Sequence, residues 1–151
     1  MMEIFNRKVA HHYLIGETFV AGMVLQGTEV KSIRNGKAQI ADAFVTIDRS
    51  GNPILINAHI ESYAFGHIQN HLPDRSRRLL LHRNEIRKLR EAIEQKGQSV
   101  VPIKLYFDKS WAKLLLAICQ GKKLHDKRES LREKTVLREA ERFLKGRSQS
   151  R

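Results

Sequence analysis

Cysteine is almost absent from this sequence of 151 residues, which contains only Cys119. A single cysteine excludes a disulfide within the chain. Its position inside an apolar run predicts a buried side chain in a reducing compartment. A reactive thiolate needs exposure and positive surroundings, so a nucleophilic role for Cys119 is not expected.

Long hydrophobic runs are also missing. The longest, such as Leu114 to Cys119, is far shorter than the ~20 residues that a membrane-spanning helix requires. No early segment combines basic residues, an apolar stretch and a small-residue cleavage site. We therefore expect a cytoplasmic protein without a membrane partner.

The sequence has few of the motifs that carry catalysis or bind cofactors. Gly121–Lys123 contains a glycine and lysines but lacks the earlier glycine of a phosphate-binding loop. His67 and His71 are four residues apart, but Gly66 and Pro73 flank them and no further ligand is suitably spaced. No carboxylate has surroundings that would raise its pKa. We predict no metal, no cofactor and no catalytic residues, with an enzyme acting on RNA as a remaining alternative.

Positive charge is abundant. The chain has 28 lysines and arginines against 16 acidic residues, a net charge of +12. From Gly121 onward it has 11 basic and 5 acidic residues, so this tail holds +6, half of the excess. Such a balance favours a polyanionic partner, most commonly nucleic acid. An anionic membrane would require a wider apolar helical face than the tail offers.

Alternating apolar residues predict two strand pairs. In the first, 43–48 and 54–60 flank a turn at 49–53, and Ile54, Ile56, Ala58 and Ile60 share one face. In the second, 100–109 and 111–119 are joined by Asp108-Lys109-Ser110; the residues predicted to point inward are Val101, Ile103, Leu105 and Phe107. Residues 13–26 read as extended segments broken by Gly16 and Gly22.

Helical spacing appears in two places. Apolar residues recur through 84–96, and Gly97 ends that helix. Residues 27–34 predict a shorter helix, which Asn35-Gly36 stops. Short strands with one or two inserted helices indicate a mainly β fold with flanking helices, a small closed or partly closed β-barrel, over 1–120. The tail, 121–151, has only a thin apolar face, so we expect it to be mobile alone and helical on a partner.

Basic and polar side chains recur in three segments of the barrel region: Asn6–Lys8 with His11, His12 and Tyr13; Gly27–Lys37; and Arg75, Arg77 and Arg78. Nothing reads as a recognition helix for a DNA major groove. Barrels of this size bind exposed bases and folded loops of RNA. RNA is therefore the predicted ligand.

Four segments carry a family resemblance. GTEVKSIRNGKAQIADAFV, RRLLLHRNEI, VPIKLYF and GKKLHDKRESLREK occur in the order and at the spacing of the SsrA-binding protein (small protein B, SmpB) family, the bacterial partner of transfer-messenger RNA (tmRNA, or SsrA). The resemblance runs from about Asn6 into the tail. It implies an oligonucleotide-binding (OB)-type β-barrel that binds the tRNA-like domain of this RNA. With elongation factor Tu, the protein would deliver the RNA to stalled ribosomes for trans-translation, as a monomer when free and without catalysis.

The resemblance also implies two sets of contact residues. The set for transfer-messenger RNA is Asn6, His11, Gly22, Glu29, Lys31, Arg34, Leu80 and Lys113. The set for the vacant small-subunit decoding centre and message channel is Gly121, Lys122, Lys123, His125, Asp126, Lys127 and Arg128. His125 can stack on a base, the cations can neutralise rRNA phosphates, and Asp126 would orient a neighbouring cation.

Three positions bear on the role of acidic residues. Glu29 would accept a hydrogen bond from a base or orient Lys31, unless it is only a helix N-terminal acid. Val20 and Leu72 stand where relatives usually have acidic residues, and Glu17 could supply the acidic group that Val20 does not. The alternative function is a general single-stranded RNA-binding or ribosome-assembly protein, which would bind many RNAs with similar affinity.

Overall fold

A computed structural model describes residues 3–66 and 69–121. His67 and the tail residues Lys122, Lys123, His125, Asp126, Lys127 and Arg128 lie outside the described residues, as does the expected tail helix. The predictions made for them therefore stay predictions. Within the two described ranges, no helix is both long enough and apolar enough to cross a bilayer.

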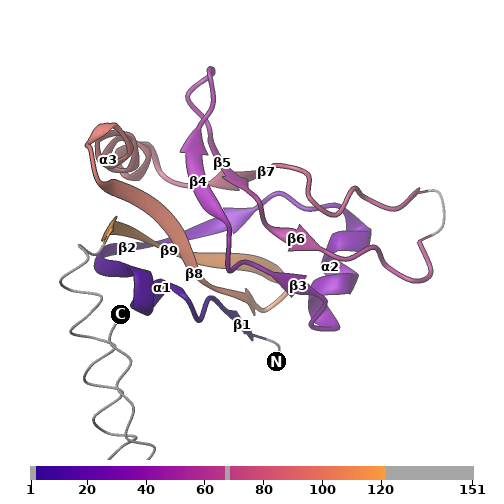
Figure 1. Cartoon of the computed structure of the whole chain (residues 1–151). Helices are drawn as coiled ribbons and strands as arrows, with labels where there is room; N and C mark the ends of the chain where they lie inside the picture. Colours follow the sequence, from indigo (N-terminus) through magenta and orange to yellow (C-terminus); the bar gives the residue numbers. More distant parts are fainter. Residues whose placement is uncertain (1–2, 67–68, 122–151) are drawn as a thin grey trace, which may run out of the picture.

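The described residues form antiparallel strands and three helices (Figure 1), so the predicted mainly β fold with few helices is confirmed, with one helix more than expected. In chain order the elements are β1 (Glu3–Phe5), α1 (Val9–His12), β2 (Tyr13–Met23), α2 (Gly27–Arg34), β3 (Ala38–Gln39), β4 (Phe44–Ile47), β5 (Pro53–Ile56), β6 (His59–Ile60), β7 (Arg77–Leu80), α3 (Arg83–Glu94), β8 (Gln98–Asp108) and β9 (Trp111–Gly121). The large sheet has the order β1-β8-β4-β5-β7-β2-β9, and β9 also pairs with β8. Strands β3 and β6 form a separate pair beside α2.

The predicted β8–β9 hairpin is confirmed. Asp108 pairs with Trp111 across a two-residue loop, in which Lys109 has a φ of 62°. Leu105 and Phe107 point into the main core and Val101 is buried, as predicted, whereas Ile103 is only partly buried. A register shift between Pro102 and Lys104 interrupts the alternation, so Val100 faces the main core. Val101 is instead buried in a second cluster, and Ile103 packs against it.

The β4–β5 hairpin is also confirmed, with Val45 opposite Leu55. The prediction that Ile54 and Ile56 share a face with Ala58 and Ile60 is wrong. Pro53 and Leu55 are the buried residues of β5, and Ile54 and Ile56 are only partly buried. Asn57 has a φ of 65°, which ends the extended run and reverses the alternation before β6.

The extended segments expected around Gly16 and Gly22 form one strand, β2. Its pairing with β9 shifts register between Ile15 and Thr18, and Gly16 lies in this irregularity. A Cβ on Gly16 would lie 2.9 Å from the carbonyl oxygen of Ile118. A glycine is therefore required there because the backbone of β9 approaches so closely.

Both predicted helices are present, as α2 and α3. Gly36 and Gly97 follow them with φ values of 75° and 84°, which is the left-handed conformation expected after a helix end. Leu89 and Ala92 are the buried residues of α3. The sequence pattern did not predict β1, α1, β3 or β7, each of which has at most four residues.

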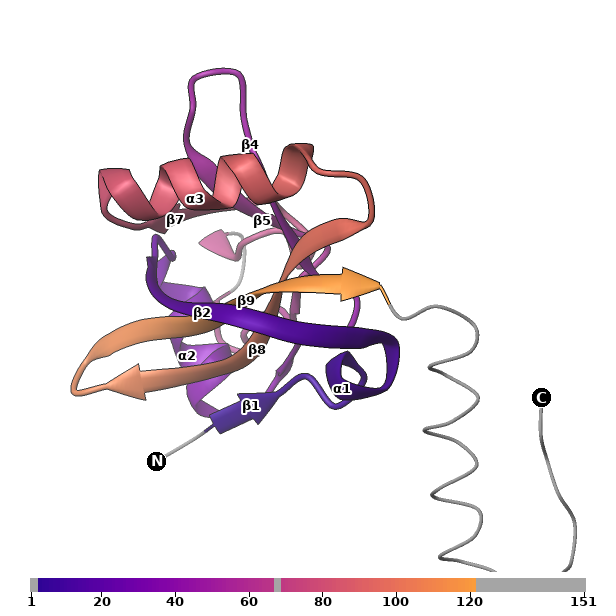
Figure 2. The ribbon, with the colours of Figure 1, turned by 90° about the vertical axis from the view of Figure 1, so that its left-hand side faces the viewer.

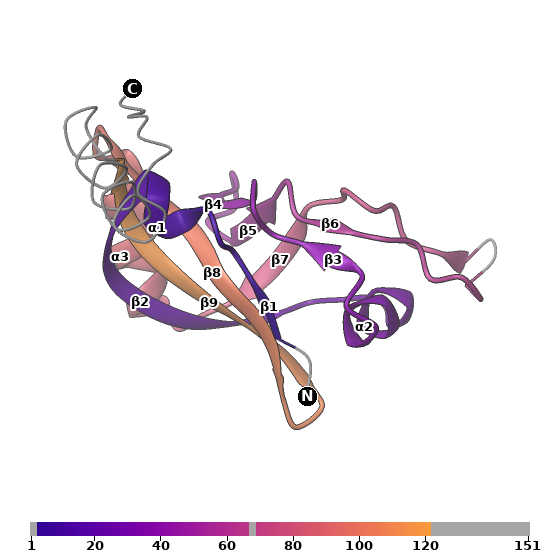
Figure 3. The ribbon, with the colours of Figure 1, turned by 60° about the horizontal axis from the view of Figure 1, so that its bottom comes forward.

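The core forms two clusters. The larger lies inside the sheet and includes Leu55, Leu79, Leu114 and Leu116, all at most 1% exposed. The smaller lies under α1 and contains Val9, Val101, Ala117 and Cys119. The burial predicted for Cys119 is confirmed, and it raises the pKa of the thiol to about 11. The second cluster fixes α1 beside the last residues of β9 (Figures 2 and 3).

Candidate RNA interface

Three of the predicted RNA-contacting residues meet on neighbouring strands. Gly22 on β2 pairs with Leu80 on β7 and with Lys113 on β9. A Cβ on Gly22 would lie 3.5 Å from the Leu80 side chain, so the glycine leaves that leucine room to lie across β2. Hairpin and strand pairing thus bring together residues that are up to 91 positions apart in the sequence.

These residues line a groove, which we call the β2–β7–β9 groove. Its lining is Val20, Gly22, Met23, Leu80, Leu81, His82, Glu85, Trp111, Ala112 and Lys113. Trp111 is 69% exposed, Leu80 53% and Val20 47%. An aromatic ring and two aliphatic side chains open to solvent beside a lysine suit a nucleic acid, because bases stack on apolar surfaces and phosphates pair with cations.

Glu29 lies in the first turn of α2 and is closed to solvent. Its Oε1 accepts hydrogen bonds from the Gln26 amide at 2.8 Å and from Arg75 Nη2 at 2.6 Å. Its Oε2 lies 2.8 Å from Arg77 Nε and 3.0 Å from Arg75 Nε. This geometry matches the alternative of a helix N-terminal acid, and an RNA contact by Glu29 stays a prediction.

Two opposing effects act on the pKa of Glu29. Burial, the largest effect, raises the pKa of the carboxyl group. Hydrogen bonds from Arg75, from the backbone of Gln26 and from Arg77 together outweigh burial and hold the pKa below its ordinary value. The group is therefore a carboxylate that joins α2 to the segment before β7.

Arg77 corrects the sequence interpretation of Arg75, Arg77 and Arg78 as a surface basic segment. Its side chain is fully buried and bonds to the carbonyl oxygens of Ala58 and Pro73 at 2.7 and 2.9 Å as well as to Glu29. It is a structural cation, because every one of these partners is internal. Alternation explains this: Arg77 and Leu79 point inward from β7, while Arg78 and Leu80 point outward.

Lys31 and Arg34 lie on the exposed side of α2. Lys31 Nζ lies 5.4 Å from the centre of the Tyr63 ring, and the Arg34 guanidinium lies 4.6 Å from that of Phe107. Both distances permit a cation–π interaction. The rings lie beside the two cations, and none of the ion pairs among the described residues includes Lys31 or Arg34.

His11 lies on α1, just before the start of β2 and far along that strand from Gly22, whereas Asn6 precedes α1 and lies beside β8. Asn6 is buried: its amide donates to the carbonyl oxygens of Pro102 at 2.9 Å and Ile40 at 3.3 Å, and its Oδ1 accepts from the Lys8 amide. These bonds position the chain that leads into α1. His11 is half-buried, with its ring 4.9 Å from that of His12 in an edge-on arrangement.

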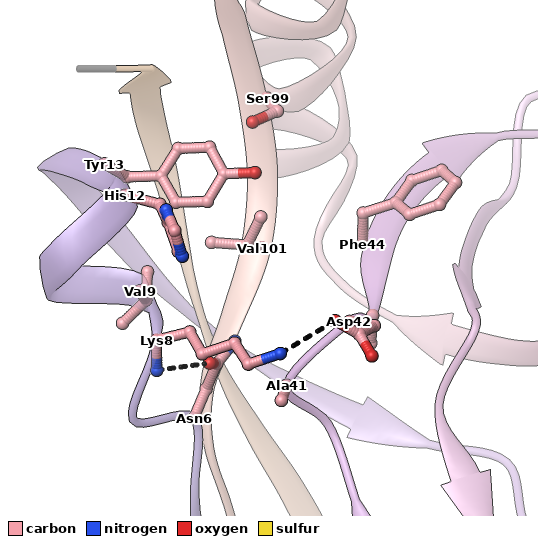
Figure 4. Close-up of a pocket in the computed structure, with 11 residues that line it drawn as sticks. Asn6, Lys8, Val9, His12, Tyr13, Ala41, Asp42, Phe44, Ser99 and Val101 are labelled. Carbon is pink, nitrogen blue, oxygen red and sulfur yellow. Dashed lines mark hydrogen bonds and ion pairs between the residues drawn. The ribbon is translucent and has the colours of Figure 1, made fainter. Parts of the chain in front are cut away.

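A second hollow adjoins α1 (Figure 4). His12 and Tyr13 lie on one side and Phe44 on the other, while Lys8 Nζ lies 3.5 Å from Asp42 Oδ1. Tyr13 pairs with Gly121, the last described residue. The described part of the chain therefore ends beside this hollow, which we call the α1 hollow.

The residues at the two departures from the family pattern are exposed. Val20 lines the β2–β7–β9 groove, whereas Leu72 is 74% exposed in the segment before β7. Glu17 does not line the groove; its carboxylate lies 3.1 Å from Lys88 Nζ on α3.

The sequence interpretation missed Trp111 and His82 as members of the groove. The chain's one tryptophan begins an alternating strand and stands on the outward side with Lys113, a signal that could have identified it. His82 is the residue before α3, and its place in the groove depends on how the helix meets β7.

In the part of the chain that the structure describes, the histidines and acidic residues do not gather into a metal site. Among residues 3–66 and 69–121, no three His, Cys, Asp or Glu side chains lie close enough together to hold a metal ion. His71 has both ring nitrogens engaged, with Thr28 Oγ1 and the Ile60 carbonyl oxygen each at 2.8 Å. It links α2 to β6.

Comparisons with known proteins point in one direction. The family model described as SmpB protein matches residues 3–146. The chain is similar to the SsrA-binding proteins of Geobacter metallireducens (52% identity) and Geobacter sulfurreducens (51%), each over 145 residues, covering 96% of this chain and 94% of the relative. The SsrA-binding protein of Oceanobacillus iheyensis is 49% identical over 140 residues, 93% of this chain and 90% of its own.

A solved structure is similar as well. A chain of "tmRNA-SmpB: a journey to the center of the bacterial ribosome" superposes with a TM-score of 0.70 at 42% sequence identity. The match covers 86% of this chain and 94% of that one. The similarity therefore extends through most of the fold described above.

Proposed function

Because this chain belongs to the SsrA-binding protein (SmpB) family, we propose that its folded part binds the tRNA-like domain of transfer-messenger RNA through the β2–β7–β9 groove. The chain acts with transfer-messenger RNA in trans-translation on the ribosome, as an RNA-binding protein and not an enzyme. The observation that carries the groove assignment is the meeting of Gly22, Leu80 and Lys113 beside exposed Trp111.

The finer fold prediction is part of the proposal. The strand pairings run from β8 through β4, β5, β7, β2 and β9, and β9 pairs with β8 again. We interpret this ring of pairings as an OB-type barrel formed by the domain 1–120. Such barrels bind nucleic acid on strand faces, which is where the groove lies.

The ribosomal contact is proposed for the other end of β2 and β9. The tail from Gly121 begins beside the α1 hollow, so this end would face the decoding centre when the tail occupies the vacant message channel. A message that fills the channel would exclude the tail, and vacancy would thereby become the signal for delivery with elongation factor Tu. We also propose that the protein is cytoplasmic and that it is a monomer when it is not bound to its partners.

A competition titration tests the RNA assignment. Transfer-messenger RNA, ordinary tRNA and unstructured RNA compete for the full chain at one fixed salt concentration, because affinities for RNA depend strongly on salt. We expect transfer-messenger RNA to displace the others at far lower concentration. Similar affinities for all three would favour a general single-stranded RNA-binding protein instead.

Truncation after Gln120 tests the division between the two ends. The shortened chain should keep most of its affinity for transfer-messenger RNA and lose peptide tagging on stalled ribosomes in a reconstituted translation assay. Loss of RNA binding together with tagging would refute this division.

A further inference from the structure

A third hollow lies between the β4–β5 turn and α3. Three arginines line it from one face of α3, namely Arg83, Arg87 and Arg90, at positions i, i+4 and i+7. The opposite wall is the turn Ser50–Asn52, which rises beyond α3 in Figure 2. We call this the arginine hollow.

The Ser50–Asn52 turn leaves room for the guanidinium group of Arg90. Asp48 Oδ1 accepts hydrogen bonds from the Ser50 and Asn52 amides, both at 2.9 Å, which fixes the turn. Gly51 has a φ of 87°, and a Cβ there would lie 3.1 Å from Arg90 Nη2. The Arg90 side chain therefore extends from α3 to the turn and packs against a residue without a side chain.

Within the described part of the chain, the arginines of this hollow have no ion-pair partner. No carboxylate-bearing residue lines the hollow, and none of the ion pairs among the described residues includes Arg83, Arg87 or Arg90. Lys88, on the same helix, pairs with Glu17 instead. Like charges held together in a concave site favour binding of an anion from outside.

Guanidinium groups select the kind of anion. Their planar donors match the oxygens of a phosphate, whereas a lysine acts as a point charge. The arginine hollow also adjoins the β2–β7–β9 groove, because Leu81 and His82 line both. A strand of RNA that leaves the groove past His82 would therefore meet the arginines next.

We propose that the arginine hollow binds backbone phosphates of the same transfer-messenger RNA whose bases contact the β2–β7–β9 groove. This inference rests on the proposed function and adds a second contact surface to it. The two surfaces have different tasks: exposed apolar side chains contact bases in the groove, and guanidinium groups position the backbone beyond it.

The test is the double substitution Arg87→Gln and Arg90→Gln in the full chain. Binding of transfer-messenger RNA is titrated at several salt concentrations, and the logarithm of the association constant is plotted against that of salt. Removal of one phosphate contact lowers the magnitude of the slope by about 0.7 to 0.9, so we expect a decrease of about 1.5 and an affinity reduced several-fold.

The matched control is Lys88→Gln with Lys96→Gln. Like the arginine variant, it removes two positive charges, one from α3 and one from the segment just after it. Neither lysine lines the hollow. The control should change the slope by less than half as much as the arginine variant. Equal effects of the two variants would overturn the proposal, because they would indicate only a general electrostatic contribution.

A conservative variant and a second ligand complete the test. Arg87→Lys with Arg90→Lys keeps both charges, so it should retain the salt slope and reduce affinity if the planar donors matter. If Arg87→Gln with Arg90→Gln binds transfer-messenger RNA like the parent but binds ribosomes more weakly, rRNA supplies the phosphates and the proposal is wrong. A different result would refute the proposed function itself, namely that the parent protein shows no preference for transfer-messenger RNA over the other RNAs.

Discussion

Glu29 and Arg77 are both closed to solvent and are bonded to each other, at 2.7 Å between Oε2 and Nη2. A buried ion pair contributes little net stability when it is complete, since both ions lose hydration. Removal of one partner is costly, because the other charge is left buried without compensation. The pair therefore specifies how α2 docks on the segment before β7.

The substitution Glu29→Gln should destabilise the protein by about 3 kcal/mol at neutral pH, because it leaves Arg77 buried with no anion. Chemical denaturation of the parent and the variant measures this difference. Glu17→Gln is the control: it breaks the exposed pair with Lys88 and should cost at most about 1 kcal/mol. Comparable decreases in stability in the two variants would contradict the structural role of Glu29.

The same pair predicts a pH dependence. The pKa of Glu29 is held below its ordinary value of 4.5, so the stabilisation is fully present above that pH. It is lost as the pH falls through the lowered pKa, where the folded protein also takes up the proton. The gap in stability between the parent and Glu29→Gln should therefore narrow on acidification below about pH 4.5. A gap that widens there would contradict the lowered pKa.

Cys119 gives a second prediction at this scale. Burial raises its thiol pKa from 9.0 to about 11, so at pH 8 the thiolate fraction is about 100-fold smaller than for an ordinary thiol. Iodoacetamide should label Cys119 at least about 100-fold more slowly in the folded protein than in denaturant, as followed by mass spectrometry. Equal labelling rates would mean that the second core cluster opens readily.

Among the elements, those with a clear period were predictable from the sequence. The β4–β5 and β8–β9 hairpins and the helices α2 and α3 follow from alternation, helical spacing and glycines at the ends. Faces were predicted less well than elements. One left-handed residue, Asn57, and one register shift near Pro102 were enough to reverse the inward side, because the period of a strand is two and any inserted residue inverts it.

Gly16 allows a test of such an irregularity. Gly16→Ala should destabilise the protein by about 1–3 kcal/mol, because the new Cβ would press on the carbonyl oxygen of Ile118. Gly27→Ala is the matched control: no atom lies within 4 Å of its added Cβ, and alanine favours the helix that begins there. Thermal unfolding of both variants measures the contrast, and a neutral Gly16→Ala would show that β9 can move away.

For the whole molecule, the positions of the predicted RNA contacts depend on strand order, which local patterns do not contain. Gly22, Leu80 and Lys113 meet only because β2 lies between β7 and β9. The family resemblance supplied these residues before any geometry was known, whereas Trp111 and His82 emerged only from the fold. The burial of Arg77 could not be predicted from its neighbours, because Arg75 is only partly buried and Arg78 is exposed.

Charge predicts how the whole chain responds to salt. The chain carries +12, and removal of everything after Gln120 takes away +6. Affinity of the truncated chain for unstructured RNA should fall and should depend less steeply on salt, because fewer counterions are released. Its preference for transfer-messenger RNA over unstructured RNA should therefore rise. An unchanged preference in competition titrations would indicate that the tail contributes equally to both.

Strand β9 extends from the β2–β7–β9 groove to Gly121, the last described residue. Lys113 lies near its start in the groove, and Gly121 ends it with a backbone hydrogen bond to Gly97. Eight residues of extended chain separate them by roughly 26 Å at about 3.3 Å per residue. If the groove binds the RNA as proposed, the length of β9 sets the distance between that RNA and Gly121, the last described residue. Lengthening β9 together with both of its partners, β8 and β2, by one pleat would increase that distance by about 7 Å while keeping Gly22 opposite Lys113.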